Sequence, residues 1–269
     1  MKKLFHLCLV LMIGLFISAC NNQVKADGIY QAATSQPDDN GWTNFLVFRV
    51  EGGKIVDATY DAVNLMEGTP QTKKELASLG LYQLAPDNAG EINVQYGLIA
   101  QYLVEHQNFD NVHFNTNGTS DAISGATIVF DNITDLFIDA LKAGPITIGD
   151  LPDGVHFSSM EGNVDSDGII YTDTLGVFVS NGRILAAHVD AYKLEDNAGI
   201  NTKYFKSRDE SQDNNEFLTQ SSLINQWIID NQGFGSVTLD NLTNGVTNEI
   251  EGVTLPIENY LTLFNKLNL

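Results

Sequence analysis

An internal repeat is the feature that most constrains how this chain can fold. Residues 98–109, LIAQYLVEHQNF, align with residues 223–234, LINQWIIDNQGF, and most positions carry identical or similar side chains. Two shorter matches follow the same order: Asp27-Gly28 with Asp153-Gly154, and residues 50–56 with residues 179–185. Because matched segments recur in the same order, we expect two copies of one structural unit.

Each copy carries signals for both strands and helices. Residues 45–50 and 55–60 are β-rich runs that flank a Gly-Gly turn, which predicts a hairpin. Residues 92–107 have apolar positions at helical spacing. We therefore predict an α+β protein with one unit over residues 27–143 and a second over 153–269. Residues 144–152, rich in Gly and Pro, form the predicted linker.

The segment Asp121-Ala122-Ile123-Ser124-Gly125-Ala126-Thr127 precedes an apolar run at helical spacing over residues 128–142. The spacing predicts a helix over that run and places Thr127 at or beside its N-terminus. Free backbone N–H groups and the positive end of a helix dipole can seat a phosphate there. A plain N-cap is the alternative, because Ser and Thr are common at that position.

The same seven residues resemble the Asp-x-x-Ser/Thr-Gly-Ala-Thr flavinylation motif of the FMN-binding domain family, and every motif position is filled. The resemblance implies that a flavin transferase joins FMN, through its phosphate, to the hydroxyl of Thr127. It assigns Asp121, Ser124, Gly125 and Ala126 to the same cofactor site. It also implies that both halves fold as a curved antiparallel sheet packed on helices.

The second copy departs from this motif. Residues 248–254, Asn-Glu-Ile-Glu-Gly-Val-Thr, keep the Gly and the Thr, but Asn248 replaces the acid, Glu251 the Ser and Val253 the Ala. A carboxylate at Glu251 opposes a phosphate nearby, and Val253 adds bulk. We therefore expect Thr254 to stay unmodified.

The N-terminus has the pattern of a secretory signal. Two lysines precede a short apolar run, and small residues lead to Cys20. This end resembles the bacterial lipobox, in which the cysteine is diacylated. We expect residues 1–19 to be a signal peptide, Cys20 to carry lipid and residues 20–26 to be a tether. An ordinary signal peptide with an incidental cysteine is the alternative.

Composition narrows the chemistry. The formal charge is −20, from 14 Lys and Arg against 34 Asp and Glu, and such a surface repels nucleic acid. The chain has two cysteines, of which Cys8 would leave with the signal and Cys20 would carry lipid. No cysteine then remains for a disulfide, an iron–sulfur cluster or a covalent haem. The histidines show no metal-site spacing, so we expect no metal.

Three functional hypotheses remain. The first is an electron-carrier lipoprotein on the outer face of the cell membrane, in a Gram-positive-type envelope. Its covalent FMN would pass electrons from a membrane quinol or dehydrogenase system to external acceptors such as ferric iron or flavins, so that the protein acts as a carrier more than as a conventional enzyme. The second is a non-redox surface module for binding or adhesion. The third adds that residues 12–18 of the signal could be released as a pheromone.

Overall fold

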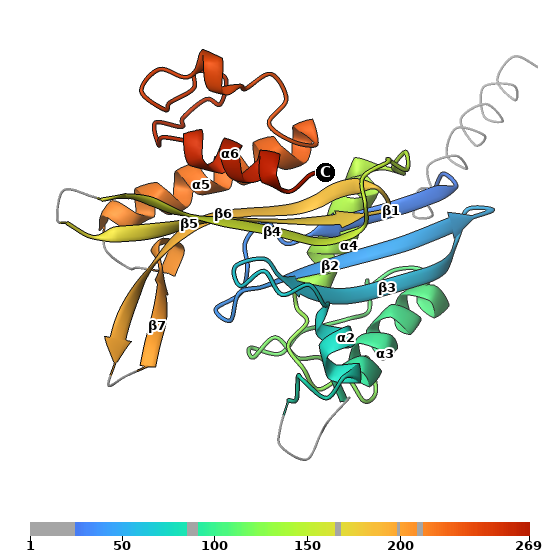
Figure 1. The fold of residues 1–269 in the computed structure, drawn as a ribbon. Helices are drawn as coiled ribbons and strands as arrows, with labels where there is room; N and C mark the ends of the chain where they lie inside the picture. The colour runs from blue at the N-terminus through green and yellow to red at the C-terminus, as the bar shows by residue number, and fades with distance from the viewer. Residues whose placement is uncertain (1–24, 85–90, 165–167, 198–199, 209–211) are drawn as a thin grey trace, which may run out of the picture.

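Two antiparallel sheets form the centre of the molecule (Figure 1). The computed structural model describes residues 25–84, 91–164, 168–197, 200–208 and 212–269, so the predicted signal peptide and Cys20 lie outside the described residues. The first sheet has the order β1 (Gly28–Ala33), β2 (Trp42–Glu51), β3 (Lys54–Asn64). The second has the order β4 (Gly154–Val164), β5 (Ile170–Ser180), β6 (Arg183–Asn197), β7 (Ile200–Phe205).

Helices cover the outer face of each sheet, which makes the fold α+β. The first half contributes α2 (Lys73–Ser78), α3 (Glu91–His106) and α4 (Ile133–Ala143). The second contributes the 3-10 turns η1 (Lys206–Arg208) and η2 (Leu239–Asn241) and the helices α5 (Gln212–Asn231) and α6 (Glu258–Lys266). Among the described residues, no helix combines the length and the apolar character needed to span a bilayer.

The order of layers is helices, sheet, sheet, helices (Figure 1). Strand β2 explains it, because Leu46, Phe48 and Val50 pack with the helices of the first half. The alternate residue Phe45 packs toward the second sheet. A strand with apolar side chains on both faces is stable only when both faces are covered. The continuous apolar run at 45–48 therefore indicates a strand buried between two layers.

The two sheets meet through a small apolar cluster. It contains Phe45 and Val63 from the first sheet, Leu65 just after it, and Phe178, Leu185 and Ala186 from the second sheet. The rings of Phe45 and Phe178 have centroids 4.7 Å apart. Gly176 allows a close approach of the two backbones, since a Cβ there would lie 2.3 Å from the carbonyl oxygen of Leu65.

The segment 144–152 hydrogen-bonds to both halves. The Ile146 N–H donates to the Ile29 carbonyl on β1 at 2.8 Å. The Gly149 N–H donates to the Asn181 carbonyl at 3.1 Å, in the turn between β5 and β6. These bonds hold the connection against the edge of the first sheet and against the second hairpin.

The predicted repeat recurs in the hydrogen bonds. The carboxylate of Asp27 accepts from the Gly53 N–H at 3.0 Å, and that of Asp153 accepts from the Gly182 N–H at 2.8 Å. Each aspartate lies just before the first strand of its half and accepts from a backbone N–H in the hairpin turn of the same half. The aligned aspartates therefore do the same structural work in both halves.

Two aligned glutamines link a helix end to a hairpin. The Gln107 side chain accepts from the Ile55 N–H at 2.8 Å and donates to the Ile55 carbonyl at 3.0 Å. Gln232 makes the same pair with Ile184, at 2.8 and 3.1 Å. Both glutamines have positive φ, 67° and 55°, a conformation that non-glycine residues adopt rarely and that the surrounding bonds must maintain.

We predict that Gly176→Ala weakens the contact between the sheets. The added methyl group would meet the Leu65 backbone, and overpacking of this kind costs about 1–3 kcal/mol. Gly97→Ala on α3 is the matched control, because a Cβ there meets no atom within 4 Å and Ala favours a helix interior by roughly 0.5–1 kcal/mol. The midpoint of urea denaturation should therefore fall for Gly176→Ala and rise for Gly97→Ala. Equal shifts in the two variants would contradict the close approach at Gly176.

Candidate functional site

The seven-residue motif lies in an irregular loop and not at a helix N-terminus. Helix α4 begins at Ile133, six residues after Thr127, so the predicted helix over 128–142 is wrong in its first turn. The reason is a competing set of bonds: the Phe130 N–H donates to the Gly118 carbonyl at 3.1 Å. The expected phosphate seat on the helix dipole is therefore absent at Thr127.

The side chain of Gln95, on α3, holds the end of the motif. Its Oε1 accepts from the Thr127 N–H at 2.6 Å and from the Ile128 N–H at 3.0 Å. Its Nε2 donates to Glu91 Oε1 at 2.9 Å, which fixes the orientation of the amide. Gln95 is 1% exposed, so this contact is part of the interior. The two backbone amides that a helix terminus would offer to a phosphate are engaged by the protein itself.

The motif alternates between buried and exposed side chains. Ile123 and Ala126 are buried in the core cluster of the first half. Asp121, Ser124 and Thr127 are exposed. The Thr127 Oγ1 lies 3.3 Å from Gln95 Oε1, which is a long O–H···O contact. The loop therefore presents the Thr127 hydroxyl at the surface on a well-anchored backbone.

Gly125 has a reason for its place in the motif. Its φ is 87°, a conformation that favours glycine. A Cβ there would also lie 2.9 Å from Leu98 Cδ1 on α3. A larger residue at this position would be strained at this φ and would require the Leu98 side chain to move.

The second half repeats the same loop geometry. Gln220, on α5, accepts from the Thr254 N–H at 2.6 Å and from the Leu255 N–H at 2.8 Å. Gly252 has φ 83° and faces Leu223. Thr254 is exposed like Thr127, whereas Val253 is 4% exposed and packs in the core. The expectation that Val253 crowds the hydroxyl is therefore wrong. The differences that remain include Glu251, also exposed, Asn248 in place of the acid, and a hydrogen bond of 3.1 Å from Gln220 Nε2 to the Thr254 hydroxyl.

Both buried glutamines escaped the sequence analysis, although a signal was present. The repeat extends N-terminally beyond residues 98 and 223 to a shared Glu-x-x-x-Gln pattern at 91–95 and 216–220. In both halves the glutamine Nε2 donates to that glutamate. Extending the repeat by a few residues would have paired Gln95 with Gln220.

A lysine stacked on an aromatic ring also recurs in both halves. Lys73 Nζ lies 4.9 Å from the ring centroid of Trp42 and 4.9 Å from that of Tyr82. Burial lowers the pKa of Lys73, while Asp38 and Asp61 act in the opposite sense. In the second half, Lys206 Nζ lies 3.9 Å from the Tyr171 ring centroid.

The other aromatic residues near the first-half loop belong to the core. Tyr60 and Tyr96 are 1% and 3% exposed, with ring centroids 4.8 Å apart. The Tyr60 hydroxyl donates to Asn132 Oδ1 at 2.9 Å, just before α4. Within the described ranges, no group of three or more His, Cys, Asp or Glu side chains is arranged to hold a metal ion.

Comparison with known proteins gives a local match to a lipoprotein. No family model matches the chain. A 57-residue stretch, 21% of this chain, is 39% identical to the 15 kDa lipoprotein of Treponema pallidum and spans 38% of that protein. The matched stretch is thus under two thirds of the relative's length.

Two solved structures are similar to part of this chain. A Clostridium thermocellum protein solved by NMR in solution is 33% identical, with TM-score 0.34, and the match covers 44% of this chain and 90% of that one. A crystal structure of a Clostridium perfringens protein is 24% identical, with TM-score 0.32, over 45% and 89% of the two chains.

We predict that Gln95→Leu loosens the motif loop. The substitution leaves the Thr127 and Ile128 amides without their acceptor, which costs about 1–3 kcal/mol. Amide hydrogen exchange at Thr127 and Ile128 should accelerate, and the free energy of unfolding should fall. Gln101→Leu is the matched control on the same helix, because Gln101 is exposed and contacts only Glu105 among the hydrogen bonds of the described residues. Unchanged exchange in Gln95→Leu would contradict the role of Gln95.

Proposed function

We propose that the protein is a lipid-anchored electron carrier with FMN covalently attached to Thr127 through a phosphoester. The observation that carries the proposal is the complete motif at 121–127 together with the exposure of the residue Thr127. An enzyme that modifies a folded protein needs a reachable hydroxyl on a loop of fixed shape. The buried Ile123 and Ala126, with Gln95 behind them, provide that fixed shape.

The chemistry of attachment fits a side-chain hydroxyl. A flavin transferase would form an O–P bond at Thr127 Oγ1 and break a pyrophosphate bond of an activated donor such as FAD. AMP would leave, the hydroxyl proton would pass to a base, and no redox change would occur. The attached flavin supplies electron transfer, and the protein supplies attachment and position.

The proposed partners follow from the cofactor and the anchor. Electrons would come from a membrane quinol or dehydrogenase system and leave to an external acceptor such as ferric iron or a flavin. The local similarity to a lipoprotein and the lipobox-like sequence before Cys20 support a lipid anchor on the outer face of the membrane. Lipid on a single cysteine holds a protein at a bilayer without a spanning helix.

A binding module without a redox group is the alternative. The observation that favours it is the recurrence of the glutamine-held loop at Thr254, where the motif is degenerate. This recurrence means that the loop geometry has a structural role that does not depend on flavin. The two functions are separated by whether the purified protein carries flavin.

We predict one covalent FMN per chain, lost in Thr127→Ala and retained in the matched variant Thr254→Ala. The Thr127 hydroxyl is exposed and its one contact is long, so the free energy of unfolding should change by less than about 1 kcal/mol. Intact-protein mass spectrometry of material from a host with an active transferase gives the number of flavins, and peptide mapping gives the position. Flavin on Thr254 would refute the stoichiometry, and flavin on neither threonine would favour the binding module.

We also predict that Cys20→Ala prevents lipidation and releases the protein into the medium. Radiolabelled palmitate should enter the wild-type precursor and be absent from the variant. Cys8→Ala is the matched control, because Cys8 lies within the apolar run of the expected signal peptide and its loss should leave labelling intact. Labelling that persists in Cys20→Ala would exclude the proposed anchor.

A further inference from the structure

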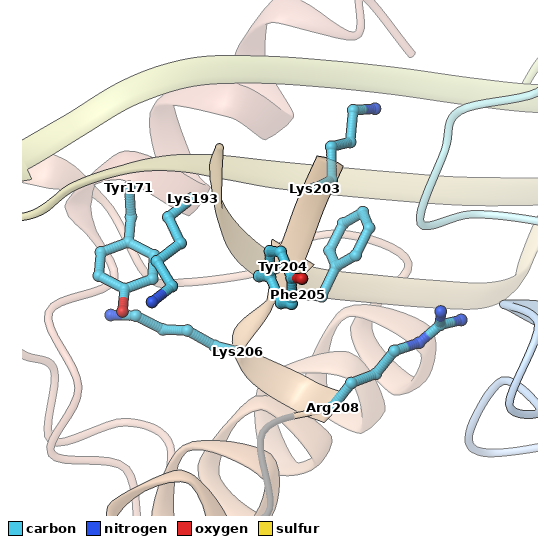
Figure 2. A pocket seen from close by; sticks show the side chains of 7 residues that line it. All are labelled: Tyr171, Lys193, Lys203, Tyr204, Phe205, Lys206 and Arg208. Carbon is cyan, nitrogen blue, oxygen red and sulfur yellow. The ribbon is translucent and has the colours of Figure 1, made fainter. Parts of the chain in front are cut away.

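A basic and aromatic pocket lies in the second half, away from the motif loop of the first half. It has a volume of about 350 Å³ and is lined by Tyr171, Lys193, Lys203, Tyr204, Phe205, Lys206 and Arg208. Four of the chain's 14 Lys and Arg residues therefore gather at one pocket of a protein whose formal charge is −20. Figure 2 shows Lys193 and Lys206 extending toward the ring of Tyr171. Lys203 and Arg208 lie on the opposite side of the view, and Tyr204 and Phe205 lie in the middle.

The cations differ in how far the protein neutralises them. Lys193 pairs with Glu195 at 2.7 Å and Lys203 with Glu67 at 2.7 Å. Within the described part of the chain, Lys206 and Arg208 form no ion pair with a carboxylate. The Arg208 guanidinium instead contacts the Met66 sulfur at 3.4 Å, which is a weak acceptor. Asp173 lies near Lys206, which opposes the effect of burial on the pKa of that carboxyl, and Asp38 and Asp39 line a separate hollow with Arg208. Lys206 and Arg208 are therefore less fully neutralised than Lys193 and Lys203, which form direct ion pairs.

Lys206 and Tyr171 also border a second hollow. That hollow, of about 200 Å³, is lined by Asp173, Phe217, Leu255, Pro256 and other residues of the second half. Leu255 directly follows Thr254, so the second hollow reaches the glutamine-held loop. Lys206 and Tyr171 thus line both the pocket and the neighbouring hollow. Of these two, the volume of the pocket is within the range typical of small-ligand sites and that of the hollow is below it.

The corresponding position in the first half is closed. Lys73 corresponds to Lys206, and Trp42 corresponds to Tyr171. The residue after each lysine donates its backbone N–H to a matching aspartate, Lys74 to Asp61 and Ser207 to Asp190. The Tyr82 ring also packs against Lys73, beside that of Trp42, and Lys73 and Trp42 are only 9% and 8% exposed. Lys206 and Tyr171 are only partly buried. The same lysine-on-ring pair is therefore core in one half and a pocket wall in the other.

We propose that this second-half pocket binds a phosphorylated aromatic ligand, the chemical class of a flavin or adenine mononucleotide, without covalent attachment. A flat ring can lie against Tyr204, which is 43% exposed, as aromatic groups pack on one another. A phosphate can be bound by Lys206, with Arg208 adding a second positive charge. The site needs no group on Thr127 and so does not depend on the proposed flavin carrier.

Equilibrium binding to the full chain, made in a host without a flavin transferase, tests this site. The probes are FMN and AMP, with riboflavin and adenosine as the same rings without phosphate, and inorganic phosphate as the anion without a ring. We expect FMN or AMP to bind, and the matching nucleoside and phosphate to bind at least tenfold more weakly. Affinity should fall as ionic strength rises. A nucleoside or phosphate that binds as well as the mononucleotide would overturn the proposal, as would no binding of FMN or AMP.

Variants place the ligand in this pocket. Lys206→Gln should weaken mononucleotide binding at least tenfold, whereas Lys206→Arg, which keeps the charge, should retain most of it. Lys142→Gln is the control, because it removes an equal charge from an exposed lysine on α4. Tyr171→Leu should weaken binding through loss of the ring beneath Lys206, and circular dichroism checks that each variant is folded. Wild-type affinity in both folded Lys206→Gln and folded Tyr171→Leu would overturn the assignment.

Discussion

The fold depends on burying both faces of the central strands. β2 sends Leu46, Phe48 and Val50 to the helices and Phe45 to the second sheet. β5 does the same with Leu175, Val177 and Val179 on one side and Phe178 on the other. Neither sheet could leave its inner face in water without exposing these side chains. The contact between the two sheets is therefore part of the core of both halves.

Polar contacts then fix the position of each connection on this apolar frame. Asp61 accepts from the Lys74 N–H at 3.1 Å, and Asp190 accepts from the Ser207 N–H at 3.2 Å. Burial raises the pKa of Asp61, while its hydrogen bonds and Lys74 act in the opposite sense. A buried polar group that lacks its partner is costly, so such pairs specify one arrangement of loop and strand. The same contact recurs in both halves.

Sequence patterns predict the helices and hairpins that depend on neighbouring residues, but they miss contacts between residues far apart in the sequence. Helix α3 and both hairpins follow from spacing and turn residues within a few positions. The error over 128–132 has a different cause. The apolar period runs through these residues, but their amides bond to Gln95, about 32 positions earlier, and to Gly118. Gln95 lies outside any window of local periodicity, and the Gly118 carbonyl carries no signal in the apolar pattern, so the irregular loop could not be predicted from the sequence.

The glutamine-held loop changes how the candidate site should be understood. A helix N-terminus would bind a phosphate through its own amides, and any threonine there would gain from the same field. Here Gln95 and Gln220 occupy those amides in both halves, so the backbone gives neither threonine an advantage. Under the proposed flavin attachment, selection between Thr127 and Thr254 would come from exposed side chains that the transferase contacts, and Ser124 against Glu251 is one such difference. The two lysine-on-ring pairs also differ in the residues around them. Tyr82 packs against Lys73 in the first half, whereas Lys206 lines a pocket in the second half. One duplicated frame thus offers an exposed hydroxyl with a complete motif on one side and a basic aromatic pocket on the other.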